Sequence, residues 1–267
     1  MSKNRKFDKF YTPAELSKEL INLTFKIIGK QNITEIIEPA AGNGSFSNQI
    51  ENCIAYDIEP EANNIIKQDF LQLNINYKRG RLFIGNPPFG NGNLYLQFYN
   101  KCCLYGDYIA FILPASQYKY SLRCYKFDLI YSKLLNEINY QGHIIRNQCF
   151  NIYKRPINGL LNKKINNKLN DVEIIDYRNY YTYDIKLGWD IAMCGWGDGT
   201  IGKRINKPHT YAKEIYIYVK NKQYLTQIDE LMKRENLLKN LPKCTSTSFL
   251  SVQMLYKYLK DNIQGIK

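Results

Sequence analysis

The chain has 267 residues, 45% of them hydrophobic, and carries a formal net charge of +13. This length and composition predict one domain, or one domain with a small appendage, built around a sizeable core. The positive charge favours a polyanionic partner, with nucleic acid ahead of a membrane surface or an acidic protein, and the alternative is a merely soluble basic protein.

The first predicted element is a helix over residues 13–28. Thr12 stands at the N-cap position, Pro13 at the first helical position and Glu15 three residues after the cap, which together form a capping box. Gly29 ends the helix. This pattern accounts for Thr12 structurally and leaves a second role in ligand binding open.

A short strand over residues 34–37 leads into the loop Glu38-Pro39-Ala40-Ala41-Gly42-Asn43-Gly44, and a helix is expected from about Ser45. Gly42 and Gly44 permit positive φ angles and a close approach of the backbone to a ligand. A strand, an acidic residue, two glycines and then a helix together indicate a cofactor-binding loop. The third small residue of a dinucleotide fingerprint is absent, which disfavours NAD.

The next predicted strand, residues 53–57, ends in Asp57, whose carboxylate can accept hydrogen bonds from both hydroxyls of a ribose. Ile58 would pack against an adenine ring. Pro60 is expected to open a helix that runs to about residue 67. Asp69 follows in a polar turn, either as a ligand-binding carboxylate or as an ordinary loop acid.

Residues 81–84 predict a short buried strand, which is followed by Asn86-Pro87-Pro88-Phe89. The two prolines fix successive φ angles and remove two N–H donors. An amide, a free carbonyl and an aromatic ring are thus presented where open α/β sheets bind ligands. A planar aromatic amine fits these groups, because Asn86 and the Pro87 carbonyl can accept its two N–H bonds while Phe89 stacks on its ring. The alternative is a tight turn that caps a core strand.

The chain then predicts a helix over residues 94–104, a strand over 107–114, a helix over 121–135 and a late strand over 149–153. Strands that alternate with helices from residue 34 to residue 155 predict an α/β fold with a doubly wound sheet.

After residue 155 the composition changes, and residues 158–170 form an Asn- and Lys-rich stretch typical of an exposed linker. Residues 197–203 match G-x-x-x-x-G-K, but Arg204 replaces the required Ser or Thr, which excludes a P-loop. A Gly-rich hairpin loop is expected instead, with Trp196, Lys203 and Arg204 placed to enter a groove.

Residues 213–220 predict a strand that rejoins the main sheet, and helical segments are expected over 224–241 and towards the C-terminus. We therefore expect a catalytic domain over residues 1–155 and an auxiliary region over 156–267. Several tyrosines in this region offer stacking surfaces for nucleic acid, although more of them are expected in the core or at its rim.

The cysteine pattern indicates in which cellular compartment the protein is found. Seven scattered cysteines without a CxxC pair predict reduced thiols inside a cell, and two histidines make a zinc site unexpected. Residues 1–9 are basic and lack the apolar core of a signal peptide. The apolar runs are too short to cross a bilayer. We expect an intracellular, soluble protein with no metal.

Four motifs occur in an order that resembles the class I S-adenosylmethionine-dependent amino-methyltransferases: Thr12-Pro13, the loop from Glu38 to Gly44, Asp69-Phe70, and Asn86-Pro87-Pro88-Phe89. The set is most similar to DNA adenine-N6 methyltransferases whose cofactor motifs precede the Asn-Pro-Pro-aromatic motif. The resemblance covers roughly residues 8–155. It implies a Rossmann-like methyltransferase sheet with a small C-terminal appendage.

The resemblance also implies S-adenosyl-L-methionine as cofactor, DNA as substrate and N6-methyladenine as product. The catalytic residues would be Asn86, Pro87, Pro88 and Phe89. The cofactor contacts would be Tyr11, Thr12, Pro13, Glu38, Pro39, Ala40, Gly42, Gly44, Asp57, Ile58, Asp69, Phe70 and Asn86. The substrate contacts would be Phe89, Phe150, Lys154, Trp196, Lys203 and Arg204, with a plain core role as the alternative for Phe150.

Other functions stay open at this point. Asn-Pro-Pro-Phe also occurs in enzymes that methylate adenine N6 in ribosomal RNA, although Tyr11-Thr12-Pro13 favours DNA. Methylation of cytosine N4 usually goes with Ser in place of Asn86, and that of protein glutamine with Tyr in place of Phe89. A catalytically silent subunit that only binds nucleic acid is the non-enzyme alternative. Specificity is either relaxed or supplied by a protein partner, and a place in restriction-modification is one of several possible roles.

Overall fold

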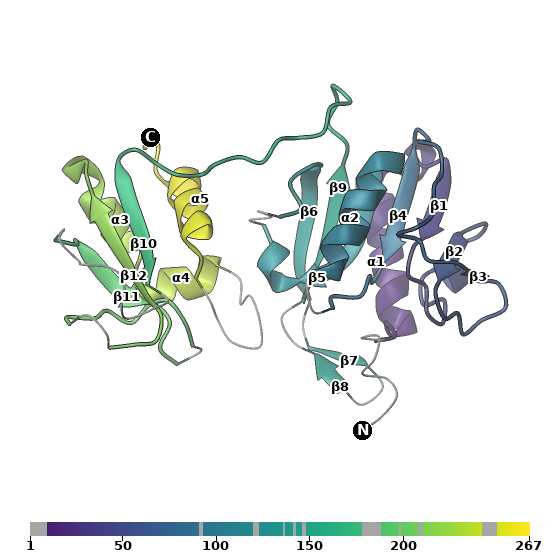
Figure 1. Ribbon diagram of the computed structural model, residues 1–267, viewed down its shortest axis with the longest axis horizontal. Helices are drawn as coiled ribbons and strands as arrows, with labels where there is room; N and C mark the ends of the chain where they lie inside the picture. Colours follow the sequence, from purple (N-terminus) through teal and green to yellow (C-terminus); the bar gives the residue numbers. More distant parts are fainter. Residues whose placement is uncertain are drawn as a thin grey trace. The chain divides into compact units, whose positions relative to one another are not determined.

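The computed structural model describes residues 10–90, 93–119, 123–135, 137–140, 143–145, 148–177, 188–197, 199–207, 210–241 and 250–267. The chain divides into two compact units, Met1–Lys164 and Ile165–Lys267, each with its own sheet (Figure 1). The division falls inside the predicted linker, somewhat later than the expected boundary at residue 155. Residues 1–9, for which a basic segment without an apolar core was predicted, lie outside the described residues.

A seven-stranded sheet forms the first unit, in the order β3-β2-β1-β4-β5-β9-β6. Its strands are β1 (Glu35–Glu38), β2 (Ile54–Asp57), β3 (Ile66–Lys67), β4 (Arg81–Gly85), β5 (Tyr108–Pro114), β6 (Asp128–Leu135) and β9 (Gln148–Lys154). All neighbouring pairs from β3 to β5 are parallel, whereas β9 is antiparallel to both β5 and β6. The strand order reverses between β1 and β4, where doubly wound sheets bind ligands. The predicted fold class is confirmed.

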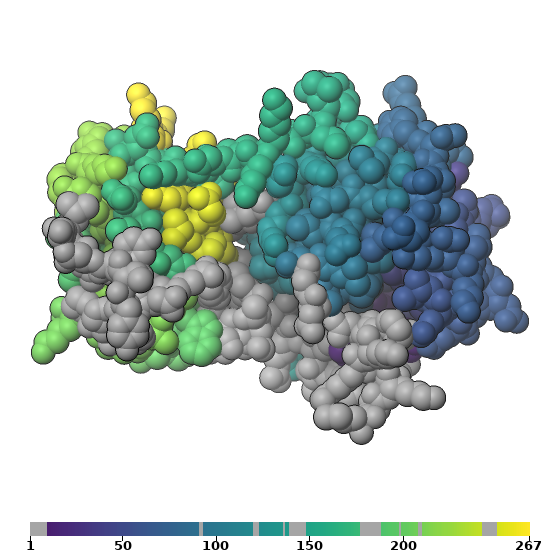
Figure 2. Space-filling model, viewed as in Figure 1, coloured from purple at the N-terminus to yellow at the C-terminus, as the bar shows by residue number. Residues whose placement is uncertain are grey.

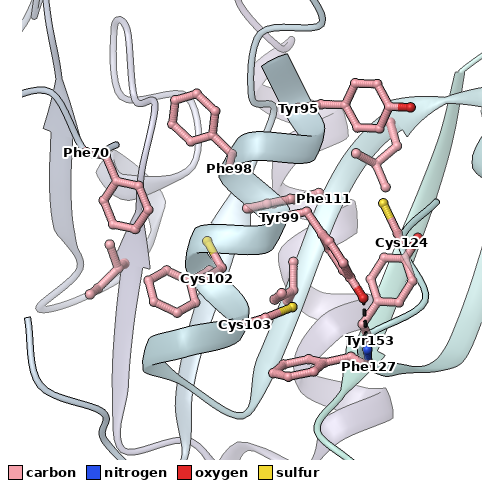
Figure 3. Close-up of a cluster of buried hydrophobic side chains, with 14 of the residues drawn as sticks. Phe70, Tyr95, Phe98, Tyr99, Cys102, Cys103, Phe111, Cys124, Phe127 and Tyr153 are labelled. Atoms are coloured by element: carbon pink, nitrogen blue, oxygen red, sulfur yellow. Dashed lines mark hydrogen bonds between the residues drawn. The ribbon is translucent and has the colours of Figure 1, made fainter. Parts of the chain in front are cut away.

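Helices cover both faces of this sheet. On one face, α1 (Ala14–Ile28) packs Leu20 and Ile21 against a core cluster that includes Ile84 and Ala110. On the other face, α2 (Leu94–Tyr105) contributes its buried residues to a second cluster with Phe83, Phe111 and Tyr153, which Figure 3 shows in part. Neighbouring strand residues point to opposite faces, so the continuous apolar runs of β4 and β5 serve both clusters.

A hairpin and an exposed linker complete the first unit. The hairpin pairs β7 (Ile138–Tyr140) with β8 (His143–Ile145). After β9, residues 157–164 form no helix or strand and run over the surface (Figure 2). Ile157 is 98% exposed. The predicted exposed linker is confirmed for residues 158–164, whereas Asn167 and Leu169, later in the predicted stretch, are buried.

The second unit has a three-stranded antiparallel sheet in the order β10-β12-β11. Its elements are β10 (Val172–Tyr177), β11 (Ile191–Cys194), β12 (Glu214–Val219), α3 (Leu225–Leu231), α4 (Arg234–Asn240) and α5 (Val252–Asn262). The Tyr256 hydroxyl of α5 accepts a hydrogen bond of 2.9 Å from Ile174 N of β10. The prediction that residues 213–220 rejoin the main sheet is wrong, because β12 is the central strand of this separate sheet.

Two predicted helices are also wrong. Residues 60–67 form turns and the short strand β3, and residues 128–135, expected as helix, form the edge strand β6. The pattern misleads in β6 because its side chains are mostly half-exposed and because the register shifts between Leu129 and Tyr131. The predicted helix over 224–241 is interrupted at Met232 and Lys233 and forms α3 and α4.

The ends of two further elements differ from the prediction. Pro13, not Thr12, is the N-cap residue of α1, and no side chain caps this helix, so the expected capping box is absent. The helix expected near Ser45 is reduced to a 3-10 turn over Ser47–Gln49. The Glu38 carboxylate accepts a hydrogen bond of 2.7 Å from Ser47 N, so a side chain of β1 satisfies a donor of this turn.

Candidate active site

Four adjacent strands each place a polar side chain at the same edge of the sheet. Glu38 is the last residue of β1 and Asp57 the last of β2, Asp69 follows β3, and Asn86 directly follows β4. Because β3, β2, β1 and β4 are parallel neighbours, their carboxyl ends meet at one edge. This is the edge at which the sequence predicted a ligand site.

A cavity of about 560 Å³ lies at this edge and brings most of the predicted residues together. This volume is in the range of sites for small molecules and cofactors. The predicted residues that line it are Tyr11, Thr12, Glu38, Pro39, Ala40, Gly42, Asp57, Ile58, Asp69, Phe70, Asn86 and Pro88. Motifs far apart in the sequence thus converge on one cavity.

Glu38 is the buried acid of the cavity, with 2% of its surface exposed. Burial raises its pKa from an ordinary 4.5 to about 7, and the negative charge of Asp57 acts in the same direction. The hydrogen bond from Ser47 N opposes this shift. Because this pKa is close to neutral pH, a cation that enters the cavity would stabilise the ionised form of Glu38.

The glycine loop is tied to Asp57. Gly42 N donates to Asp57 Oδ2 at 2.7 Å, and Glu59 N donates to Asp57 Oδ1 at 2.8 Å. Each carboxylate oxygen has two lone pairs, so both can accept one further hydrogen bond from a ligand hydroxyl. Ile58, next in the chain, is 45% exposed and lines the cavity as an apolar wall.

Asp69 and Phe70 form the floor on the β3 side. Asp69 Oδ1 accepts a hydrogen bond of 2.9 Å from Leu71 N. The Phe70 ring lies nearly parallel to that of Phe98 from α2, with ring centroids 6.1 Å apart and an interplanar angle of 8°. An apolar surface with one carboxylate beside it suits an aromatic ring that carries an amine.

The residues of the Asn-Pro-Pro-Phe turn take different positions. Asn86 and Pro88 line the cavity, whereas Pro87 is buried. Phe89 is half-buried and packs edge-on against Tyr95, with ring centroids 6.2 Å apart. Asn86 Nδ2 donates to Phe10 O and to Thr12 Oγ1, both at 3.4 Å.

Two predicted cofactor residues lie beside this cavity rather than in its wall. Pro13 and Gly44 line a neighbouring hollow of about 400 Å³ that shares Tyr11, Thr12 and Ser45 with the main cavity. Pro13 is the N-cap residue of α1, and Gly44 is the last residue of the glycine loop.

The structure corrects two predicted substrate contacts. Phe150 is completely buried in the core cluster on the α1 side of the sheet, which favours the alternative core role. Lys154 pairs in register with Tyr108, the first residue of β5, so it lies at the amino edge of the parallel strands. Because β9 runs antiparallel, its last residue is carried away from the cavity edge.

The other predicted substrate contacts belong to the second unit. Trp196 is 49% exposed on the loop that follows β11, and Thr200 Oγ1 donates to its carbonyl at 2.7 Å. Lys203 is exposed on the same loop. Arg204 forms an ion pair of 2.8 Å with Asp229, which offsets part of its charge.

The sequence interpretation missed several residues of the cavity wall, namely Phe10, Ala41, Ser45, Phe46, Gln68, Leu71, Gly90, Leu94 and Phe98. Most are chain neighbours of predicted residues and could have been found from that. Phe98 could not, because only the packing of α2 on the sheet brings it to Phe70.

Two features are absent from the described residues. None of the helices among them is long and apolar enough to cross a membrane. No group of three or more His, Cys, Asp or Glu side chains in these ranges is arranged to hold a metal ion.

No protein-family model and no curated protein matches this chain. Among similar solved structures, a proposed RNA methyltransferase from Pyrococcus horikoshii is 19% identical over 57% of this chain and 88% of its own, with a TM-score of 0.47. A proposed class I S-adenosylmethionine-dependent methyltransferase from Listeria monocytogenes is 15% identical over 59% and 63%, with a TM-score of 0.45. A Thermoplasma acidophilum protein is 19% identical over 58% and 98%, with a TM-score of 0.42. Because these TM-scores are below 0.5, any functional proposal rests on the chain's own site.

Proposed function

We propose that this chain is an S-adenosyl-L-methionine-dependent methyltransferase that modifies the N6 amine of adenine in DNA. The observation that carries the proposal is the convergence of Glu38, Asp57, Asp69 and Asn86 on one cavity, one from the end of each of four adjacent strands. Three carboxylates and one carboxamide at this edge match the motif order that the sequence shares with amino-methyltransferases.

The residues of the cavity fit the parts of this cofactor. Glu38, buried and with a pKa of about 7, would hold the ammonium group of the methionine moiety. Asp57 has lone pairs free for the two ribose hydroxyls, as in other nucleotide-binding sheets. Asp69 would accept from the adenine amine, with Ile58 and Phe70 as the apolar surfaces around the ring.

The Asn-Pro-Pro-Phe turn would act on the substrate amine. When bound, S-adenosyl-L-methionine supplies a methyl group on a positively charged sulfur atom, and in-line attack of a nucleophile on the methyl carbon would break the carbon–sulfur bond and release a neutral thioether. Asn86 Oδ1 and the Pro87 carbonyl would accept the two N–H bonds of the amine and hold its nitrogen lone pair towards the cavity. Phe89 would stack on the base, with its ring set by the edge-on contact with Tyr95. Positioning of this kind can supply much of the rate acceleration.

The substrate has to leave its helix to reach this turn. An adenine inside a duplex is stacked on its neighbours, so its amine cannot meet the methyl group until the nucleotide is flipped out. The net charge of +13 favours binding to the phosphate backbone. In the second unit, Trp196 and Lys203 would contribute stacking and charge to nucleic-acid binding.

The test is transfer of a labelled methyl group. Purified protein is incubated with S-adenosyl-L-methionine labelled at the methyl group and with unmethylated duplex DNA or, separately, RNA. The proposal predicts label in DNA. Label only in RNA would move the target to RNA, and cofactor binding without label in either would indicate a silent subunit.

A further inference from the structure

The segment Phe10–Pro13 contacts the candidate catalytic amide directly. Asn86 Nδ2 donates to the backbone carbonyl of Phe10 and to the hydroxyl of Thr12, each at 3.4 Å. Thr12 is 5% exposed, and its hydroxyl does not cap α1. The sequence assigned this hydroxyl to helix capping, and the structure turns it towards Asn86 instead.

The two contacts determine which way the carboxamide faces. A backbone carbonyl can only accept a hydrogen bond, so the nitrogen of Asn86 has to face Phe10. The oxygen then points away from the segment. With the amide reversed, two oxygens would meet at Phe10, and an N–H group would meet the substrate amine, donor against donor. At 3.4 Å each bond is long, so the orientation depends on both contacts together.

The segment that supplies these acceptors is itself fixed. The Tyr11 ring packs on Gly42, and the Tyr11 hydroxyl donates to Glu61. On the other side, Ser17 N donates to Pro13 O at 3.0 Å in the first turn of α1. Thr12 is therefore held between two anchored residues, which fixes the position of its hydroxyl beside Asn86.

We propose that Thr12 is a positioning residue: its hydroxyl, with the Phe10 carbonyl, orients the Asn86 carboxamide so that Oδ1 faces the substrate amine. This inference rests on the proposed function for the role of Oδ1. The orientation of the amide rests only on the contacts of Asn86. Phe10 and Thr12, which line the cavity, thus also orient the oxygen atom that would accept a hydrogen bond from the substrate amine.

Kinetics of three variants test the role. Thr12→Val keeps the shape of the side chain without the hydroxyl, and Thr12→Ser keeps the hydroxyl. We expect kcat at saturating cofactor and substrate to fall about tenfold in Thr12→Val and to recover in Thr12→Ser, with cofactor Kd changed less than threefold. The matched control is Thr24→Val, which removes an equally buried hydroxyl from α1 outside the cavity, and its kcat should stay at the wild-type value. An unchanged kcat in Thr12→Val, with only cofactor Kd raised, would overturn the proposal.

A second measurement does not depend on turnover. The side-chain NH₂ signals of Asn86, assigned by their loss in Asn86→Asp, are followed by NMR in protein labelled at asparagine. In Thr12→Val their exchange with solvent should rise several-fold, and in Thr24→Val it should not change. If Thr12→Val does not fold, Thr12→Ala replaces it. Unchanged exchange on loss of the hydroxyl contradicts the positioning role, whether or not the wild-type protein methylates nucleic acid.

Discussion

The Tyr11 ring lies so close to Gly42 that a Cβ atom at Gly42 would come within 2.9 Å of Tyr11 Cε1. Gly42 also has a φ of +56°, a conformation that other residues adopt only with strain. The glycine loop and the N-terminal segment can therefore meet over the cavity only because this position has no side chain.

Gly42→Ala should weaken cofactor binding at least tenfold, because the added methyl group displaces the Tyr11 ring and strains the loop. Calorimetric titration with S-adenosyl-L-methionine measures the effect. Gly159→Ala is the matched control, since Gly159 has a φ of +75° but no atom within 4 Å of an added Cβ. It should cost about 1 kcal/mol of stability from backbone strain alone and leave the cofactor Kd unchanged. Equal cofactor affinities in both variants would show that the Tyr11 contact is dispensable.

Glu38 should make stability depend on pH. Its pKa is about 7 in the folded protein and about 4.5 when unfolded. Between these values the folded protein keeps a proton that the unfolded chain has lost, so stability falls as pH rises through this window and levels off above about 7. Glu38→Gln should abolish this contribution and be more stable than the wild type at pH 8, by up to about 3 kcal/mol at 1.36 kcal/mol per pKa unit. Urea unfolding of both proteins at pH 4.5, 6 and 8 measures the difference, and parallel pH profiles would refute the shifted pKa.

Cofactor affinity should also depend on pH through the Glu38 carboxyl group, but in the opposite direction: it should rise with pH, whereas stability falls. If ionised Glu38 holds the ammonium group, the affinity for S-adenosyl-L-methionine falls as pH drops below about 7, approaching tenfold per unit. Glu38→Gln should bind more weakly at pH 8 and show a flatter profile between pH 5 and pH 8. A wild-type Kd that does not change over this range would argue against the contact.

Trp196 should contribute to nucleic-acid affinity. Its ring is 49% exposed, and a base stacked on such a ring is worth about 1–3 kcal/mol. We expect Trp196→Ala to raise the Kd for single-stranded DNA about tenfold in a fluorescence anisotropy assay. Leu238→Ala removes an apolar side chain that is 43% exposed on α4 of the same unit, and it should bind as the wild type does. The same loss in both variants would point to a general effect on the second unit.

The parts of the fold that the sequence predicted correctly are those with local signals. The buried strands around residues 84 and 110 are continuous apolar runs, and Gly29 and the Pro87-Pro88 pair mark ends and turns whatever their surroundings. Glu38, Asp57 and Asn86 followed from predicted strands, because parallel strands bring their carboxyl ends together. Asp69 came from the family resemblance, since the segment that forms β3 was predicted as a helix.

The errors arose where tertiary contacts outweigh local preference. Thr12 has the sequence context of a cap, yet its hydroxyl faces Asn86, 74 residues away. Lys154 follows a correctly predicted strand, but the sequence does not reveal that β9 runs antiparallel and carries it to the far edge. The edge strand β6 lacks the apolar continuity that identified the central strands.

The identity of the modified nucleoside tests the central claim most directly. Duplex DNA is incubated with S-adenosyl-L-methionine and either wild-type protein or Asn86→Ala, then digested to nucleosides and analysed by mass spectrometry. We predict N6-methyladenine with the wild type, and a loss of at least a thousandfold in Asn86→Ala, whose cofactor Kd should stay within a few-fold of the wild type. N6-methyladenine formed equally well by Asn86→Ala would contradict the role given to this turn, and a methylated nucleoside other than N6-methyladenine would contradict the proposed target.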